Sequence, residues 1–240
     1  MLQCSFSITN NLDHKLACWA QPFWELIKHS SMHQESPKHW IEIAKKINSI
    51  AQTGLTFSKD PFDKERYEEL LELSIQIMSN LTNIDSQKLE FVFNRDAGYL
   101  TPKISVRAVI IKGNKILLVK EKSDNKWSLP GGYAEAGMTP SEIAVNEVKE
   151  EAGYDVKPIR ILGLIDYNQH QDKPFPFDVY QLFMECEIVG GDPQPGLETS
   201  AVEFFDAKKL PELSTRRVTK EQVLKMFELQ ENRNLDPIFD

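Results

Sequence analysis

The spacing of apolar residues between positions 37 and 100 predicts helices. In two runs, apolar side chains recur at intervals of three and four residues, which places them on one face of an α-helix. Gly54 ends the first run, the step Asp60-Pro61 begins the second, and a shorter helix is predicted around Ser86–Phe93. The first run is Trp40, Ile43, Ile47 and Ile50, and the second is Tyr67, Leu70, Leu71, Ile77 and Met78.

Two helices joined by a short loop form a helical hairpin. A hairpin of this size buries little apolar surface by itself, so it has to pack on the following domain or on a second copy of itself. An apolar stripe left on its surface therefore favours a homodimer.

The pattern changes to strands from about residue 101. Apolar residues alternate with others from Ile104 to Ile111, and Gly113-Asn114 offers a tight turn into a second strand at 116–119. Later strands are predicted at 127–129, 159–166, 179–189 and 202–205, and helices at 140–152 and 219–227. Strands around a central helix with one further helix predict an α/β fold, an α/β/α sandwich with a mixed sheet.

The helix at 140–152 has clear signals at both ends. Thr139 caps its first turn, Pro140 suits the first helical position, and Glu142 completes a capping box with Thr139. Gly153 is a natural stop. The sequence therefore fixes the length of this helix and the direction of its faces.

Three carboxylates share one side of this helix. Glu147, Glu150 and Glu151 lie three and four residues apart, whereas an apolar stripe with a spacing of four lies on another face. Like charges on one helix face repel one another, and a hard cation such as Mg²⁺ or Mn²⁺, which prefers oxygen ligands, would reverse that repulsion. The alternative is a solvated acidic face, which is a common surface feature.

The sequence in front of this helix decides between these readings. From Gly131 to Tyr154 the chain reads GGYAEAGMTPSEIAVNEVKEEAGY, which resembles a Nudix box with its first glycine at Gly132. The preceding Leu129-Pro130-Gly131 also matches the usual approach to the box. The matching positions of the box are Gly132, Glu147, Val148, Glu150, Glu151, Gly153 and Tyr154.

Two positions depart from the pattern. Met138 stands where the box has its first Glu, and Asn146 stands where it has Arg. In family members that keep them, these two side chains help to hold the loop against the helix. The departures concern the bracing of the loop, and they leave the Glu-X-X-Glu-Glu core intact.

The resemblance extends to the helical segment. The stretch AQTGLTFSKDPFDKERYEEL is similar to the small helical module that precedes the Nudix domain in a bacterial group of ADP-ribose and CDP-choline pyrophosphatases. We therefore divide the chain into an N-terminal extension of unassigned role at 1–36, a helical hairpin module with its connector at 37–100, and a Nudix hydrolase domain at 101–240.

Composition and charge narrow the function classes. The formal net charge of −8 argues against a broad basic surface for nucleic acid, so binding to long RNA is possible but not favoured. No apolar run has the length of a membrane span. Three cysteines without metal-ligand spacing, together with an N-terminus that lacks the pattern of a secretory signal, favour a cytoplasmic location.

The resemblance also implies roles for individual residues. Glu147, Glu150 and Glu151 would ligate Mg²⁺ or Mn²⁺, with the carbonyl of Gly131 or Gly132 as a further ligand. In the alternative assignment, Glu147 or Glu151 would orient the attacking water. Glu198, in the loop before the last predicted strand, is a separate candidate for ligand or base, and its alternative is an ordinary surface charge.

The substrate side is less specific. The segment from Asp166 to Phe183 supplies aromatic, basic and acidic residues that could hold a choline-like cation or stack on a base, although aromatic residues at alternate strand positions are more often core. The substrate-binding candidates are Arg107, Tyr167, His170, Lys173, Phe177 and Tyr180.

These observations lead to one main hypothesis and two alternatives. The main hypothesis is an Mg²⁺-dependent pyrophosphohydrolase that acts on a small nucleoside diphosphate linked to another group, X, with CDP-choline or ADP-ribose as candidates from resemblance. The first alternative is a hydrolase of RNA 5′ ends or of the nucleotide pool. The second is a non-catalytic Nudix fold that binds a metabolite as a sensor.

Overall fold

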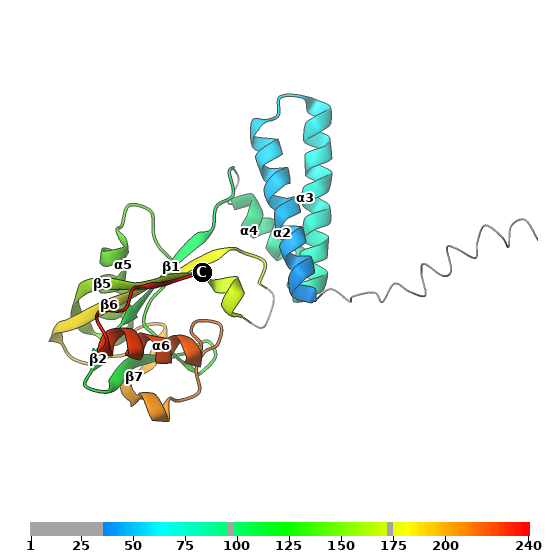
Figure 1. Ribbon diagram of the computed structural model, residues 1–240. Coiled ribbons are helices and arrows are strands. Elements are labelled where there is room, and N and C mark those ends of the chain that lie inside the picture. The colour runs from blue at the N-terminus through cyan, green and yellow to red at the C-terminus, as the bar shows by residue number, and fades with distance from the viewer. Residues whose placement is uncertain (1–35, 96–97, 172–174) are drawn as a thin grey trace, which may run out of the picture.

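The computed structural model describes residues 36–95, 98–171 and 175–240. A helical hairpin stands beside an α/β body (Figure 1). The predicted extension at 1–36 lies outside the described residues, except for Ser36. No helix in the described ranges is long and apolar enough to cross a membrane.

The first half of the described chain forms three helices. They are α2 (Pro37–Phe57), α3 (Pro61–Thr82) and α4 (Ser86–Arg95). All three were predicted, but α2 continues past Gly54, its predicted end, to Phe57. Ser36 and Asp60 cap the first two helices by accepting backbone N–H bonds, and a proline follows each cap. The N-cap at Asp60 explains why the Asp-Pro step separates the two long helices.

The apolar stripe predicted on α2 faces outward. Trp40 is 48% exposed and Ile50 is 51% exposed. The inward face of α2 instead carries several polar residues, whose side chains bond to one another and to the neighbouring helices. The buried residues of α2 are Ile41, Ala44, Lys45, Asn48, Ala51 and Gln52. The helix was therefore predicted correctly, and its most regular apolar face is a surface.

Two sheets make up the second half. A mixed sheet has the order β1-β6-β5-β8, with β1 parallel to β6 and β5 antiparallel to it. In the second sheet, β3 pairs antiparallel with β2, β4 and β7. The strands are β1 (Lys103–Val109), β2 (Ile111–Lys112), β3 (Lys115–Glu121), β4 (Trp127–Ser128), β5 (Tyr154–Asp166), β6 (Val179–Gly191), β7 (Thr199–Asp206) and β8 (Ile238–Phe239).

A helix covers each side of these strands (Figure 1). On one side, α5 (Pro140–Ala152) packs its apolar stripe against β1, β3 and β6 in a core that includes Val106, Leu117 and Val148. On the other side, α6 (Lys220–Glu231) buries Val223 and Met226 against the opposite faces of the strands. The predicted α/β/α arrangement with a mixed sheet is confirmed, and the helical segment precedes it.

The hairpin and the α/β body are in direct contact. Lys45 of α2, which is only 6% exposed, pairs with Asp178 in the segment before β6. Phe177 packs against Phe93 of α4, with ring centroids 5.1 Å apart. The Lys38 ammonium donates to the carbonyl of Gln171 at 3.4 Å. An ion pair and an aromatic contact therefore join the two parts.

Candidate functional site

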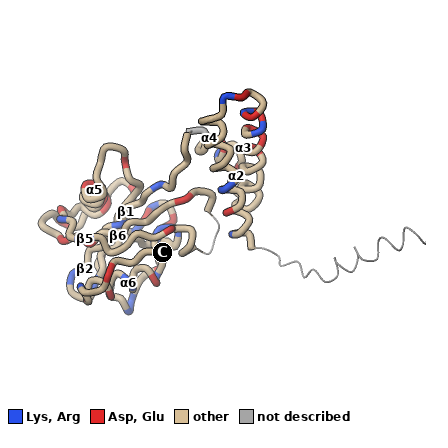
Figure 2. Tube along the Cα trace, turned by 45° about the horizontal axis from the view of Figure 1, so that its top comes forward, with Lys and Arg blue, Asp and Glu red and all other residues tan. Residues whose placement is uncertain are grey.

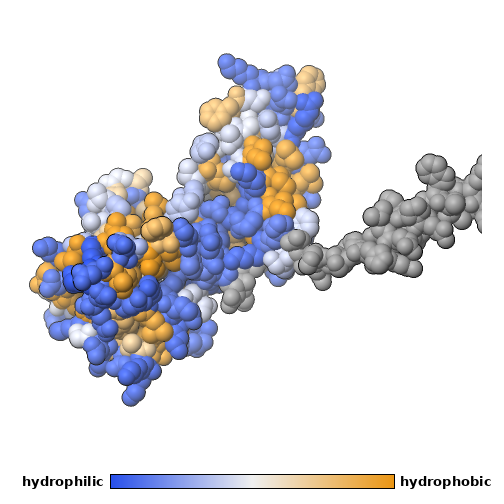
Figure 3. All heavy atoms as spheres, viewed as in Figure 1, coloured by the Kyte–Doolittle hydropathy of each residue, from blue (hydrophilic) through white to orange (hydrophobic). Residues whose placement is uncertain are grey.

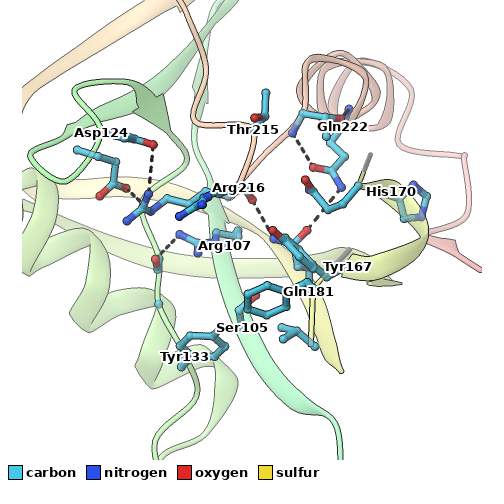
Figure 4. A pocket seen from close by; sticks show the side chains of 18 of the residues that line it. Ser105, Arg107, Asp124, Tyr133, Tyr167, His170, Gln181, Thr215, Arg216 and Gln222 are labelled. Atoms are coloured by element: carbon cyan, nitrogen blue, oxygen red, sulfur yellow. Dashed lines mark hydrogen bonds and ion pairs between the residues drawn. The ribbon is translucent and has the colours of Figure 1, made fainter. Parts of the chain in front are cut away.

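A large cavity opens between α5, the floor formed by β1 and β6, and the loop before α6. Its volume is about 2660 Å³. The two glycines at the start of the predicted box line it, and so do all four predicted acidic residues: Glu147, Glu150, Glu151 and Glu198. Figure 4 shows the part of this cavity around Arg107 and Tyr167.

Helix α5 brings its three glutamates to the cavity at different depths. The capping box at Thr139 and the left-handed stop at Gly153 are both present, so the helix has the predicted bounds. Its buried stripe fixes the rotation of the helix, and this rotation leaves Glu150 exposed, Glu147 half-buried and Glu151 buried at 8% exposure. Figure 2 shows acidic positions on α5.

The loop in front of α5 is held from two sides. The N–H of Gly131 donates to a carboxylate oxygen of Glu151 at 2.9 Å, and the carbonyl of Gly131 accepts from the guanidinium of Arg107. The same guanidinium donates to the carbonyl of Leu129 at 3.4 Å. The carbonyl of Gly132 accepts from the N–H of Val106 at 2.8 Å. Arg107 and Glu151 therefore brace this loop.

The two departures from the box lie away from this bracing. Met138 is partly buried against the core under α5, and Asn146 is exposed on the helix. Arg107 thus supplies a contact to the loop from β1, a strand that the box motif does not include. Its position in the sequence gave no signal of this role beyond an arginine between the apolar residues Val106 and Ala108.

The glycines leave no space for a larger side chain. A Cβ on Gly131 would lie 2.0 Å from the carbonyl oxygen of Val106, and its φ of +146° disfavours other residues. A Cβ on Gly132 would lie 2.1 Å from a carboxylate oxygen of Glu147. The backbone at Gly132 and the carboxylate of Glu147 are therefore in close contact.

The electrostatics of the glutamates are those of an uncompensated anionic site. Burial raises the pKa of Glu151 to about 8, and the charges of Glu121 and Glu147 add to the rise against the hydrogen bond from Gly131. Burial also raises the pKa of Glu147, Arg107 opposes this rise, and Glu150 and Glu198 add to it. Bringing a cation to this wall would lower the cost of ionising these groups.

The side chains do not form a closed metal cage. Within the described ranges, no three His, Cys, Asp or Glu side chains are arranged closely enough to hold an ion. The chemistry of the donors nevertheless fits a hard cation, because the cavity wall offers several carboxylates that repel one another and nearby backbone carbonyls. The residues therefore fit Mg²⁺ or Mn²⁺, provided that the exposed carboxylates turn toward it.

Glu198 lies beside the carboxylates of α5. It is exposed on the loop before β7 and acts on the pKa of Glu147. Lys122 anchors that loop, since its ammonium donates to the carbonyls of Gly196 and Leu197 at 3.2 and 2.9 Å. Glu198, which was selected from its place in the sequence, therefore lines the same cavity as the glutamates of the box.

The substrate-binding candidates fall into three groups. Arg107, Tyr167 and His170 line the cavity, and His170 contacts a carboxylate oxygen of Asp240 at 2.7 Å. Lys173 lies outside the described residues. The remaining two, Phe177 and Tyr180, do not line this cavity.

The geometry of the chain explains where those two residues lie. Phe177 packs between Phe93 and Phe175 at the junction with the hairpin. Tyr180 is 41% exposed because side chains alternate along β6, and the cavity takes its neighbours Val179 and Gln181 instead.

A buried ionic network beneath the cavity had no sequence signal. Glu121 at the end of β3 is 2% exposed, accepts from the Ser128 hydroxyl at 2.5 Å, and pairs with Arg217 at 3.1 Å. Arg217 also pairs with Asp124 at 3.6 Å. Glu121, Asp124 and Ser128 are close in sequence, but Arg217 is distant from all three, and only the packing of the loop before α6 against β3 and β4 brings it to them.

Family profiles cover most of the chain. Residues 38–93 match a profile described as a UDP-X-like N-terminal oligomerisation domain. Residues 101–227 match the NUDIX domain. Both matches agree with the hairpin and the α/β body that the structure separates.

Individual relatives agree with the profiles. A putative ADP-ribose pyrophosphatase of Bacillus subtilis is 42% identical over 201 residues, which are 84% of this chain and 97% of that protein. An ADP-ribose pyrophosphatase of Methanocaldococcus jannaschii is 36% identical over 119 residues, which are 48% of this chain and 69% of that protein.

Two solved structures share the fold. The crystal structure of a UDP-X diphosphatase has a TM-score of 0.56 at 32% identity. The match covers 86% of this chain and 100% of the chain in that crystal structure. That of an ADP-ribose pyrophosphatase from Streptococcus suis has a TM-score of 0.54 at 37% identity and covers 58% of this chain and 100% of its own. Fold, box and relatives agree, and the chain belongs to the Nudix family as a pyrophosphatase with an N-terminal UDP-X-like oligomerisation domain.

Proposed function

We propose that this protein is a divalent-metal-dependent pyrophosphohydrolase of small nucleoside diphosphates linked to a group X. The observation that carries the proposal is the wall of the cavity, where Glu147, Glu150, Glu151 and Glu198 meet the glycine loop. The relatives bear ADP-ribose and UDP-X names, so ADP-ribose and UDP-linked compounds join CDP-choline as candidate substrates.

The acidic residues would hold Mg²⁺ or Mn²⁺ through Glu147, Glu150 and Glu151, with the carbonyl of Gly131 beside them. When bound, such ions neutralise phosphate oxygens and lower the pKa of water. Both candidate carbonyls already accept one hydrogen bond, that of Gly131 from the Arg107 guanidinium and that of Gly132 from the N–H of Val106, so either would ligate an ion through its second lone pair.

The residues of the chain contribute positioning. Arg107 and Glu151 hold the glycine loop in place, so the backbone that would face the diphosphate is fixed before substrate arrives. Glu198, on the anchored loop opposite α5, is placed to accept a proton from the attacking water, and Glu147 and Glu151 stay the other candidates for this role. Positioning and electrostatics would supply most of the rate enhancement.

A panel assay tests the proposal. The pure protein is incubated with ADP-ribose, CDP-choline, UDP-glucose and capped RNA in the presence of Mg²⁺ or Mn²⁺, and is compared with Glu150→Gln and with the surface control Glu203→Gln. We expect turnover of a small compound that Glu150→Gln lowers and Glu203→Gln does not. The absence of turnover on every compound points to a sensor, and turnover of RNA alone points to an RNA 5′-end hydrolase.

A second prediction concerns Glu151. We expect Glu151→Gln to lower kcat by about 10² or more, in the range of lost catalytic groups, while the protein stays folded. Val148→Ala, one turn earlier on the core face, should instead lower the melting temperature with a smaller effect on kcat. Equal losses of stability in both variants would contradict this division of faces.

The assembly and the compartment are also proposals. The hairpin presents an apolar surface, and its profile is described as an oligomerisation domain, which supports a homodimer formed through α2 and α3. A cytoplasmic location stays a prediction, and the free thiol of Cys186, which is buried, is compatible with it.

A further inference from the structure

The cationic residues that line the cavity are not equivalent. Arg107 is engaged with the glycine loop, Lys126 pairs with Glu212 at 2.8 Å, and Lys225 pairs with Glu228 at 2.8 Å. Arg216 also lines the cavity, and it has no ion pair and no side-chain hydrogen bond to any part of the chain that the structure describes. Its guanidinium is thus an exposed cation without a partner among the described residues, as is the ammonium of Lys220, which also lines the cavity from the start of α6.

The loop that carries Arg216 is held firmly by its neighbours. Arg217 donates to the hydroxyls of Ser214 and Ser123 at 3.1 and 3.2 Å, in addition to its pairing with Glu121. The carbonyl of Arg217 accepts from the Gln181 amide at 2.8 Å. These polar contacts, two of them partly buried, hold the backbone on the carboxyl side of Arg216, so its side chain extends from an anchored segment.

Arg216 faces a polar part of the cavity. Figure 4 shows Arg216 next to Arg107, with Tyr167 to the right and Ser105 and Tyr133 below them in the view. Tyr167 and Arg216 both line the cavity; burial raises the pKa of Tyr167, and the charge of Arg216 opposes that rise. The hydroxyl of Ser105, a residue 3% exposed, has no hydrogen-bond partner.

This region is distinct from the wall that would hold the cations. Arg107 contacts the glycine loop in front of α5, whereas Arg216 extends into the cavity from the loop before α6. Arg216 and the glutamates line one cavity, so a ligand whose diphosphate lies at the glutamates can extend one of its two substituents to Arg216. A free guanidinium attracts anionic and hydroxyl-rich groups and repels cations.

We propose that Arg216, with the Tyr167 hydroxyl beside it, binds the X group and selects an X that is anionic or rich in hydroxyls over one that carries a positive charge. The inference rests on the proposed function, because it assumes that the diphosphate lies at the glutamates. It argues against choline and in favour of sugar-like or acidic X groups.

Three substrates with one base isolate the charge of X. UDP-glucuronate, UDP-glucose and UDP-glucosamine differ by one charge at each step at pH 7. We expect kcat/KM to fall in that order for the unaltered protein. In Arg216→Gln, the ratio of kcat/KM for UDP-glucuronate to kcat/KM for UDP-glucosamine should be about tenfold or more smaller, mainly through changes in KM. Arg216→Glu should reverse the order, and Arg216→Lys should keep it.

Controls separate this role from a loss of fold. Lys208→Gln removes a positive charge from an exposed position outside the cavity and should leave the ratio unchanged. A ratio that is the same in Arg216→Gln as in the unaltered protein overturns the proposal. An equal loss on all three substrates also overturns it, because it would place Arg216 at the diphosphate.

Binding separates this inference from the proposed function. Calorimetric titration of the three UDP-sugars into Glu151→Gln, with and without Arg216→Gln, measures affinity where hydrolysis is expected to be slow. A charge preference that depends on Arg216 supports the subsite even if the panel assay shows no hydrolysis. If the panel assay shows hydrolysis but Glu151→Gln binds all three UDP-sugars with equal affinity, the proposed activity is supported and the proposed subsite is contradicted.

Discussion

At the scale of single residues, the cavity wall holds more negative charge than its surroundings compensate. Glu151 is buried, its pKa is raised to about 8, and its carboxylate accepts a hydrogen bond from the N–H of Gly131. Natural proteins keep such uncompensated groups where a ligand supplies the missing charge. Ionising these carboxylates therefore costs free energy in the ligand-free protein.

This cost predicts how stability depends on pH in the metal-free protein. The folded pKa of Glu151 lies above the ordinary value of 4.5, so the folded state binds a proton that the unfolded state releases between about pH 4.5 and 8. Stability should fall by about a few kcal/mol as pH rises through this window. Urea unfolding with a chelator present, at pH 5.5 and pH 8, measures this.

The matched variant is Glu151→Gln, which has no charge to release. Its stability should change less over the same pH range, and Mn²⁺ added at pH 8 should stabilise the unaltered protein more than the variant. An identical pH dependence of the two proteins would mean that Glu151 ionises freely in the folded state.

The adjacent glycines should respond differently to substitution. A Cβ on Gly131 meets the backbone at Val106, which cannot move easily, so Gly131→Ala should destabilise the fold by about 2 kcal/mol or more. A Cβ on Gly132 meets the end of the Glu147 side chain, which can turn away. Gly132→Ala should keep the melting temperature within a few degrees and lower kcat. Thermal unfolding and steady-state kinetics of the two variants compare these effects.

At the scale of secondary structure, helix α2 has two different faces. The regular apolar series that predicts the helix, Trp40, Ile43, Ile47 and Ile50, faces outward or is only partly covered, while a mixed face with Asn48 packs inside. Figure 3 shows apolar side chains gathered along the hairpin. The further exposed apolar residues of the hairpin are Phe57, Phe62 and Leu73.

A surface of this kind predicts association. A charge at Ile50 should convert the homodimer into monomers, because burying an unpaired lysine in an apolar interface is costly, while α2 remains folded through its other face. Light scattering should report half the mass for Ile50→Lys, and circular dichroism should show unchanged helix content. Lys46→Gln, on an exposed position of the same helix, is the control. A monomeric mass for the unaltered protein at high concentration would remove the dimer.

At the scale of the whole molecule, the hairpin is part of the surroundings of the cavity. Pro37 and the turn that follows α3, including Asn83 and Ile84, contribute to its lining. The contact between Lys45 and Asp178 sets how the hairpin lies against the α/β body. The two parts are therefore expected to influence the same site.

The junction can be tested through its ion pair. Asp178→Asn leaves the buried Lys45 with Glu42 as its one remaining carboxylate partner at 2.9 Å, and should cost about 1–3 kcal/mol. The exposed pair between Lys149 and Asp155 offers a control, since Asp155→Asn should cost no more than about 0.5 kcal/mol. Thermal unfolding measures both. A raised KM in Asp178→Asn would show that the junction shapes the cavity, and equal stability of the two variants would contradict the structural role of Lys45.

The sequence determined the local elements and the acidic motif. Caps at Thr139 and Asp60, a stop at Gly153 and strand alternation act over a few residues, so their signals are complete within short stretches. The spacing of Glu147, Glu150 and Glu151 likewise specifies one helix face without reference to the rest of the chain.

The tertiary structure decided which faces are buried and which distant residues meet. Both faces of α2 carry helical periodicity, and only packing against α3 and α4 selects the inner one. The bracing by Arg107, the network around Glu121 and the display of Arg216 depend on strands and loops that lie far apart in sequence and meet only in the fold. Hydrogen bonds and charge interactions act through space, so a linear pattern cannot encode their partners.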